Sequence, residues 1–124
     1  MKSEIKISAA AKVATIDIVG VIGVPEESQF DSPDQKVATY ERFEQSLAQI
    51  GAIEADRVII NIRSTGGDVN DALLIYDAVK ALSAEVVTRC YGYVASAATV
   101  IAQAASEGCR ELSSNSLYLI HCCE

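Results

Sequence analysis

The segment at residues 58–68, which reads VIINIRSTGGD, decides the fold. Its first five residues form a short, nearly continuous apolar run, the pattern of a parallel strand that is covered on both faces. The glycine pair then punctuates the chain, and Asp68 is a good N-cap for a helix whose apolar residues recur at helical spacing over 72–82. The segment therefore predicts one unit of strand, glycine turn and helix.

The same unit is repeated along the chain. Residues 85–91 predict a strand that leads through Gly92 into a helix of small residues at 96–105. Upstream, residues 12–23 are dominated by β-branched side chains and predict a strand, and residues 117–121 predict a last one. Strands that alternate with helices indicate an α/β domain with right-handed crossovers.

The connection after the first strand is polar. Residues 24–34 hold both prolines and predict a loop. Ser32 then predicts a helix N-cap, with Pro33 at the first helical position and Gln35 at the third. The helix is expected to place one apolar face on a sheet and to end at Gly51.

Composition narrows the class of protein. The 124 residues suit a single domain, and 50% hydrophobic with 22% charged residues is too apolar for disorder. With a net charge of −7, the chain lacks the excess of basic residues that nucleic-acid-binding proteins need, so we expect no nucleic-acid partner. The longest uncharged stretch, 90–106, is too short and too polar for a membrane span, and no secretory signal precedes the first strand, so we expect a cytoplasmic protein. The four cysteines are too few for a disulfide scaffold and are expected to be reduced.

Three features lie where predicted strands end, the position at which ligands of open α/β folds gather: the pair Gly66-Gly67, Ser96 and His121. Glycines let the backbone turn sharply and present an N–H to a ligand, as an oxyanion site requires. A serine at a strand-to-helix turn places its hydroxyl at a helix N-terminus, beside the following Ala97 N–H. His121, the one histidine of the chain, is then a candidate to take the serine proton.

Each feature also has a plain structural interpretation. A glycine pair is often a turn before a capped helix, a serine there is often an N-cap, and a lone histidine is often structural. A phosphate site is disfavoured because no Lys-Ser or Lys-Thr and no third glycine follows the pair, and residues 92–96 do not match the G-x-S-x-G elbow. We expect no metal site, because His121, Cys122 and Cys123 are consecutive and alternate in direction along a strand. We also expect no bound cofactor.

Taken together, three motifs resemble the Clp protease proteolytic subunit family in order and spacing. They are residues 62–69 (IRSTGGDV), 92–98 (GYVASAA) and 116–121 (SLYLIH). In that family the nucleophilic serine lies 25 residues before the catalytic histidine and 29 after the second glycine of the pair, the spacing of Ser96 from His121 and from Gly67 here. The resemblance runs from about residue 12 to the end of the chain.

The resemblance implies a fold and an activity. The fold is crotonase-like, an α/β domain over 1–124 with repeated strand-strand-helix units and a mostly parallel sheet covered by helices. The activity is that of a serine endopeptidase that degrades unfolded polypeptides fed to it by an ATP-driven unfoldase. The resemblance also implies assembly into homo-oligomeric rings.

Roles carried over by the resemblance fall on matching positions. Ser96 is the nucleophile, His121 is the general base and acid, and the backbone N–H groups of Gly67 and Ala97 form the oxyanion hole. The substrate adds as an extended strand beside the segment that starts at Gly67, Asp68 and Val69, a main-chain mode that tolerates many sequences.

Two departures from the family keep alternatives open. Family chains continue past the histidine into a handle and into the aspartate that orients the imidazole, so the resemblance puts both beyond Glu124. Cys122 and Cys123 also differ from the residues usual after the histidine. A catalytically silent assembly or adaptor relative would show no covalent labelling, and an acyl-CoA hydratase or isomerase of the same superfold would bind CoA.

Overall fold

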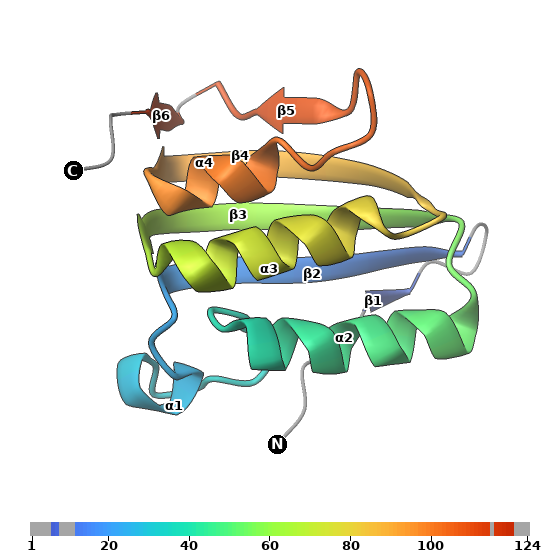
Figure 1. The fold of residues 1–124 in the computed structure, drawn as a ribbon, viewed down its shortest axis with the longest axis horizontal. Coiled ribbons are helices and arrows are strands. Elements are labelled where there is room, and N and C mark those ends of the chain that lie inside the picture. The colour runs from blue at the N-terminus through green and yellow to red at the C-terminus, as the bar shows by residue number, and fades with distance from the viewer. Residues whose placement is uncertain (1–5, 8–11, 115, 121–124) are drawn as a thin grey trace.

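The computed structural model describes residues 6–7, 12–114 and 116–120, and these form one layer of strands and one of helices (Figure 1). No helix among these residues has the length and apolar character needed to cross a membrane. In chain order the elements are β1 Lys6–Ile7, β2 Val13–Ile22, α1 Glu26–Gln29, α2 Tyr40–Ile53, β3 Arg57–Gly67, α3 Val69–Lys80, β4 Glu85–Ala95, α4 Ala97–Ala102, β5 Arg110–Leu112 and β6 Leu117–Leu119.

The strands form one sheet with the order β1-β2-β3-β4-β5, and β6 also pairs with β4. Only β1 is antiparallel among the described pairings; β2 through β6 pair in parallel. β5 pairs with β4 at Thr88 to Cys90 and β6 pairs with it at Tyr93 to Ala95, so the two short strands follow one another along the same edge. The predicted α/β class with a mostly parallel sheet is confirmed.

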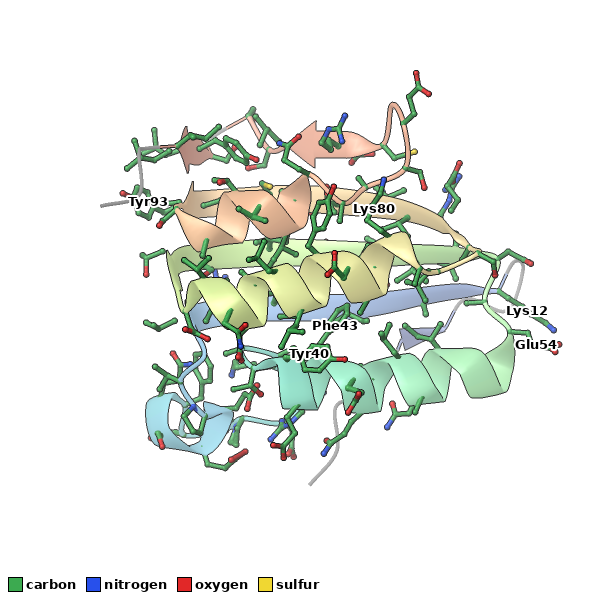
Figure 2. All side chains as sticks on the ribbon, in the orientation of Figure 1. Lys12, Tyr40, Phe43, Glu54, Lys80 and Tyr93 are labelled. Atoms are coloured by element: carbon green, nitrogen blue, oxygen red, sulfur yellow. The ribbon has the colours of Figure 1, made fainter. Side chains whose placement is uncertain are left out.

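Helices α3 and α4 lie in front of the sheet in Figure 1, and the core lies between these two layers. Phe43 of α2 is fully buried in it (Figure 2). In β3 the buried side chains alternate with more exposed ones, so Val58, Ile60 and Ile62 are buried whereas Ile59 and Asn61 are only half-buried. The prediction that this strand is covered on both faces is therefore wrong for the described residues.

Helix α2 begins later and ends later than the sequence predicts. Its N-cap is Thr39, whose hydroxyl accepts the Arg42 N–H, and it continues through Gly51 to Ile53. Ser32 is not a cap because the chain after it first runs beside β2, where the Val37 N–H donates to Asp17 O at 2.9 Å. Pairing with a strand thus competes with the local capping pattern and replaces it.

The connection from β2 to α2 is more ordered than a polar loop. It contains α1, and the Glu26 side chain is buried although it carries a carboxylate. That carboxylate accepts the Ala38 N–H at 2.6 Å and the Thr39 N–H at 2.9 Å. The carboxylate therefore satisfies backbone donors just before α2 and fixes where the helix starts.

Candidate active site

The carboxyl ends of β3 and β4 meet at one edge of the sheet, and this brings Gly66 against Ser96. A Cβ placed on Gly66 would lie 2.8 Å from the Ser96 Cβ and 3.1 Å from the Ala97 N. The first distance is shorter than real Cβ atoms show, the second is tight, and Gly66 has a φ of 101°, so glycine is required for this approach. The structure thus brings together the glycine pair and the serine that the sequence analysis selected.

The glycine pair belongs to β3 and is not a turn after it. β3 extends to Gly67, which pairs with Ile22 of β2. Gly67 has a φ of 146°, and a Cβ on it would lie 2.2 Å from Ile22 O. The sequence prediction ended this strand too early because the glycine pair lowers strand propensity, whereas the neighbouring strands keep pairing with it.

Ser96 occupies a strained turn between β4 and α4. Its φ is 56° and its ψ is −126°, a region that residues with a side chain rarely adopt. It stands at the N-cap position of α4, yet its side chain makes no capping hydrogen bond. Within the described part of the chain the Ser96 hydroxyl has no hydrogen-bond partner, so its structural interpretation as a side-chain cap is wrong.

The backbone around Ser96 is held on both sides. Its N–H donates to Leu119 O of β6 at 3.0 Å, and its carbonyl accepts the Thr99 hydroxyl at 2.6 Å. Ala97 is the first residue of α4, so its N–H has no partner inside the helix. The serine is therefore fixed by its peptide groups, while its hydroxyl bonds to none of the residues that the structure describes.

Asp68 and Val69 lie at the surface beside Gly67. The Asp68 carboxylate caps α3 by accepting the Asp71 N–H at 3.0 Å, as the sequence predicts. The Asp71 carboxylate accepts the Tyr40 N–H at 3.0 Å. These two carboxylates thus hold backbone at the start of α3 and of α2.

His121, Cys122, Cys123 and Glu124 lie outside the described residues. The last described residue is Ile120, and β6 ends at Leu119, whose carbonyl accepts the Ser96 N–H. Within the described segments no group of three His, Cys, Asp or Glu side chains is arranged to hold a metal ion. Burial raises the pKa of the nearby Cys90 thiol to about 11, so this thiol is a poor nucleophile at neutral pH.

Sequence reasoning missed three residues that shape this site: Thr99, Gln103 and Tyr118. Tyr118 alternates with the exposed Leu117 and Leu119, which is the signal for a side chain on the helix-covered face. No pattern in the sequence indicates that Thr99 and Gln103 face it.

Fold and site together define an α/β protein in which a serine stands on a strained strand-to-helix turn beside a glycine pair of the neighbouring parallel strand. A family model described as Clp protease matches residues 32–124, which is most of the chain. The chain belongs to the Clp protease family.

Individual relatives agree with this assignment. The ATP-dependent Clp protease proteolytic subunit of Carsonella ruddii is 41% identical over 64 residues, which cover 52% of this chain and 33% of that protein. The proteolytic subunit 2 of Treponema denticola is 39% identical over 82 residues, covering 65% of this chain and 41% of the relative. The chain thus matches less than half the length of these relatives.

Solved structures give the same fold. ClpP1 from Listeria monocytogenes superposes with a TM-score of 0.70 at 30% identity, over 86% of this chain and 55% of that one. The ClpP protease catalytic domain from Plasmodium falciparum has a TM-score of 0.69 over 89% of this chain and 55% of its own, and at 23% identity it supports the fold alone.

Proposed function

We propose that this chain carries the nucleophile of a serine endopeptidase that cuts unfolded polypeptides through an acyl-enzyme. The observation that carries the proposal is Ser96 itself, a residue with a side chain in a backbone region suited to glycine, whose hydroxyl makes no hydrogen bond to the described residues. Strained residues of this kind cluster at active sites. Membership of the Clp protease family supports the same role.

In this proposal the reaction has two steps. The Ser96 hydroxyl oxygen attacks the carbonyl carbon of the scissile peptide while His121 accepts its proton. The C–N bond then breaks, His121 returns the proton to the leaving amine, and an acyl-Ser96 ester is left. Water hydrolyses the ester by the reverse sequence of proton transfers, and free Ser96 is regenerated.

The proposed oxyanion donors are the N–H groups of Gly67 and Ala97. Two supporting observations concern their neighbours. The Gly66 N–H donates to the Ser64 hydroxyl at 3.0 Å and the Asp68 N–H donates to Ile22 O at 2.8 Å, so the amides on either side of Gly67 have partners. The Ala97 N–H has no intrahelical acceptor. Such N–H donors stabilise the negative oxygen of the tetrahedral intermediate.

Substrate is proposed to bind by main-chain pairing along the segment from Gly67 to Val69. All three residues are exposed, and Val69 is 47% exposed, so the segment lies at the surface within reach of an extended peptide. Main-chain pairing needs no particular side chain and therefore suits unfolded polypeptides of many sequences. We also propose that the chain forms a homo-oligomer that works with an ATP-driven unfoldase. The name of the Carsonella relative, an ATP-dependent proteolytic subunit, supports a subunit role coupled to ATP.

Peptide hydrolysis by this chain tests the proposal. A fluorogenic peptide is incubated with the parent protein, with Ser96→Ala, and with Ser83→Ala as a matched control at an exposed serine. We expect Ser96→Ala to lose at least about 10³-fold in kcat and Ser83→Ala to match the parent. Equal turnover by the parent and Ser96→Ala would contradict the proposal. Titration with CoA in a calorimeter distinguishes the acyl-CoA alternative, which requires binding.

A further inference from the structure

Strand β6 is tied to helix α4 by the side chain of Tyr118. The Tyr118 hydroxyl accepts the Gln103 amide N–H at 2.8 Å and donates to Thr99 O at 3.1 Å. Both partners belong to α4 or to its C-cap, whereas Tyr118 belongs to β6. One phenol therefore joins the element that follows Ser96 to the strand that leads toward His121.

These contacts close a ring of interactions that returns to Ser96. The Ser96 N–H donates to Leu119 O at 3.0 Å, and Leu119 follows Tyr118 in β6. The Tyr118 hydroxyl donates to Thr99 O, and the Thr99 hydroxyl donates to Ser96 O at 2.6 Å. The position of β6 along α4 is thus linked to both peptide groups of the serine.

The surroundings of Tyr118 keep its hydroxyl as a hydrogen-bond donor. Its neighbours Leu117 and Leu119 are 66% and 44% exposed, whereas Tyr118 is half-buried on the face toward α4. Burial raises the pKa of its phenol above the usual value, so the hydroxyl stays protonated at neutral pH. Its ring also forms one wall of a small cavity of about 240 Å³.

We propose that Tyr118 is a positioning residue, which sets the register of β6 against α4 and thereby holds the backbone turn that presents the Ser96 hydroxyl. The inference rests on the proposed function for its chemical consequence. β6 has three residues and pairs only with β4 among the described strands, so few other contacts fix it. A small slip of β6 would move Leu119 O away from the Ser96 N–H and change the orientation of the serine hydroxyl, on which its attack depends.

Two variants separate the hydroxyl from the rest of the side chain. Tyr118→Phe removes both hydrogen bonds and keeps the ring that lines the cavity. Gln103→Leu removes one of the two hydrogen-bond partners. Because Gln103 is exposed, this substitution leaves the packing of the core intact. Tyr91→Phe is the matched control, since Tyr91 is an exposed tyrosine of β4 whose hydroxyl has no hydrogen bond in the described structure.

The experiment measures two quantities on each variant and on Ser96→Ala. The first is the rate of labelling by a fluorophosphonate probe, separated into its maximal rate and its half-saturating concentration. The second is hydrogen exchange at the Ser96 amide, which reports the bond to Leu119 O without any need for catalysis. Tyr118→Phe is expected to lower the maximal labelling rate about tenfold with an unchanged half-saturating concentration. Its Ser96 amide is expected to exchange faster, while Gln103→Leu gives a smaller change of the same kind and Tyr91→Phe none.

The outcomes distinguish this inference from the proposed function. If the parent is labelled at Ser96 and Tyr118→Phe matches it in both quantities, the inference is wrong and the proposed function stands. If the parent is not labelled, the proposed function fails for this chain. Hydrogen exchange at the Ser96 amide then tests by itself whether Tyr118 sets the register of β6 against α4. Unchanged exchange in Tyr118→Phe would then overturn the inference, and faster exchange would support it.

Discussion

Two strand-to-helix junctions lie at the same edge of the sheet and are built in opposite ways. From β3 into α3, Asp68 has ordinary extended backbone and its carboxylate caps the helix. From β4 into α4, Ser96 has a φ of 56° and its side chain caps nothing. The first junction follows the local rules for starting a helix, and the second breaks them.

The difference between the two junctions shows where this molecule tolerates backbone strain. A strained non-glycine residue costs about 1 to 3 kcal/mol and persists only where its surroundings fix it. Gly66 packs against Ser96, Leu119 O accepts its N–H, and the Thr99 hydroxyl bonds its carbonyl. All three contacts hold the backbone of Ser96 and none uses its hydroxyl, which is the arrangement expected of a nucleophile.

The largest loss of stability is expected from a substitution at the first junction. Gly67→Ala places a Cβ 2.2 Å from Ile22 O at a φ of 146°, so the backbone of β2 or β3 must shift. We expect the free energy of unfolding in urea to fall by about 3 kcal/mol. Gly51→Ala is the control, because Gly51 lies in α2 with nothing near its Cβ position and is expected to gain about 0.5 to 1 kcal/mol. A Gly67→Ala protein as stable as the parent would show that the close pairing of β2 and β3 is not required.

The two strands that carry these junctions are expected to respond differently to alkaline pH. The buried face of β4 contains Cys90, whose thiol has a pKa raised from 9.0 to about 11, whereas the buried face of β3 has no titratable side chain. Above pH 9 the thiol ionises in the unfolded chain and stays neutral in the folded one. Stability that is complete below pH 9 is therefore lost as the pH rises toward 11. We expect a loss of about 1 to 2 kcal/mol in urea unfolding, and a shallower dependence in Cys90→Ala. An equally steep loss in that variant would remove Cys90 as the cause.

Removing the cap tests whether the first junction is structural. Asp68→Ala is expected to lower the free energy of unfolding by about 1 kcal/mol, because the Asp71 N–H loses its acceptor. Asp68→Asn keeps a capping oxygen and is expected to remain close to the parent. Thermal or urea unfolding of both variants measures the effect. If Asn destabilised as much as Ala, charge and not capping would account for the role of Asp68.

Relieving the strain tests the second junction. Ser96→Gly permits the positive φ without a Cβ and is expected to raise the free energy of unfolding by about 0.5 to 1 kcal/mol. Ser96→Ala keeps the Cβ and is expected to bring no such gain. Urea unfolding of the pair measures the difference. A Ser96→Gly protein no more stable than Ser96→Ala would show that the turn at Ser96 is not strained.

The sequence predicted β2, β3, β4 and β6 and the three longer helices in their order, because apolar and β-branched runs are local signals. It missed the short elements β1, α1 and β5. It failed where tertiary pairing decides the outcome. Gly66 and Gly67 look like a turn, yet the strands on either side extend β3 to include them. Ser32 looks like a cap, yet Val37 pairs with β2 and delays the helix to Thr39.

The candidate site divides in the same way. Ser96, the glycine pair and Asp68 were predictable because each follows a strand and has a distinct residue type. Tyr118 was not predictable as a tether, because its partners are an amide and a backbone carbonyl of a helix whose position only the fold defines. Buried Glu26 was missed for the same reason, since a glutamate in a polar loop carries no sign that backbone donors surround it.

The most direct test of the account is to locate where a fluorophosphonate probe attaches. The parent protein is labelled, digested and mapped by mass spectrometry. The account predicts one adduct, on Ser96, and no adduct on any other serine. Absence of any adduct, or adducts spread over other serines, would contradict the claim that the strained turn between β4 and α4 exists for chemistry at Ser96.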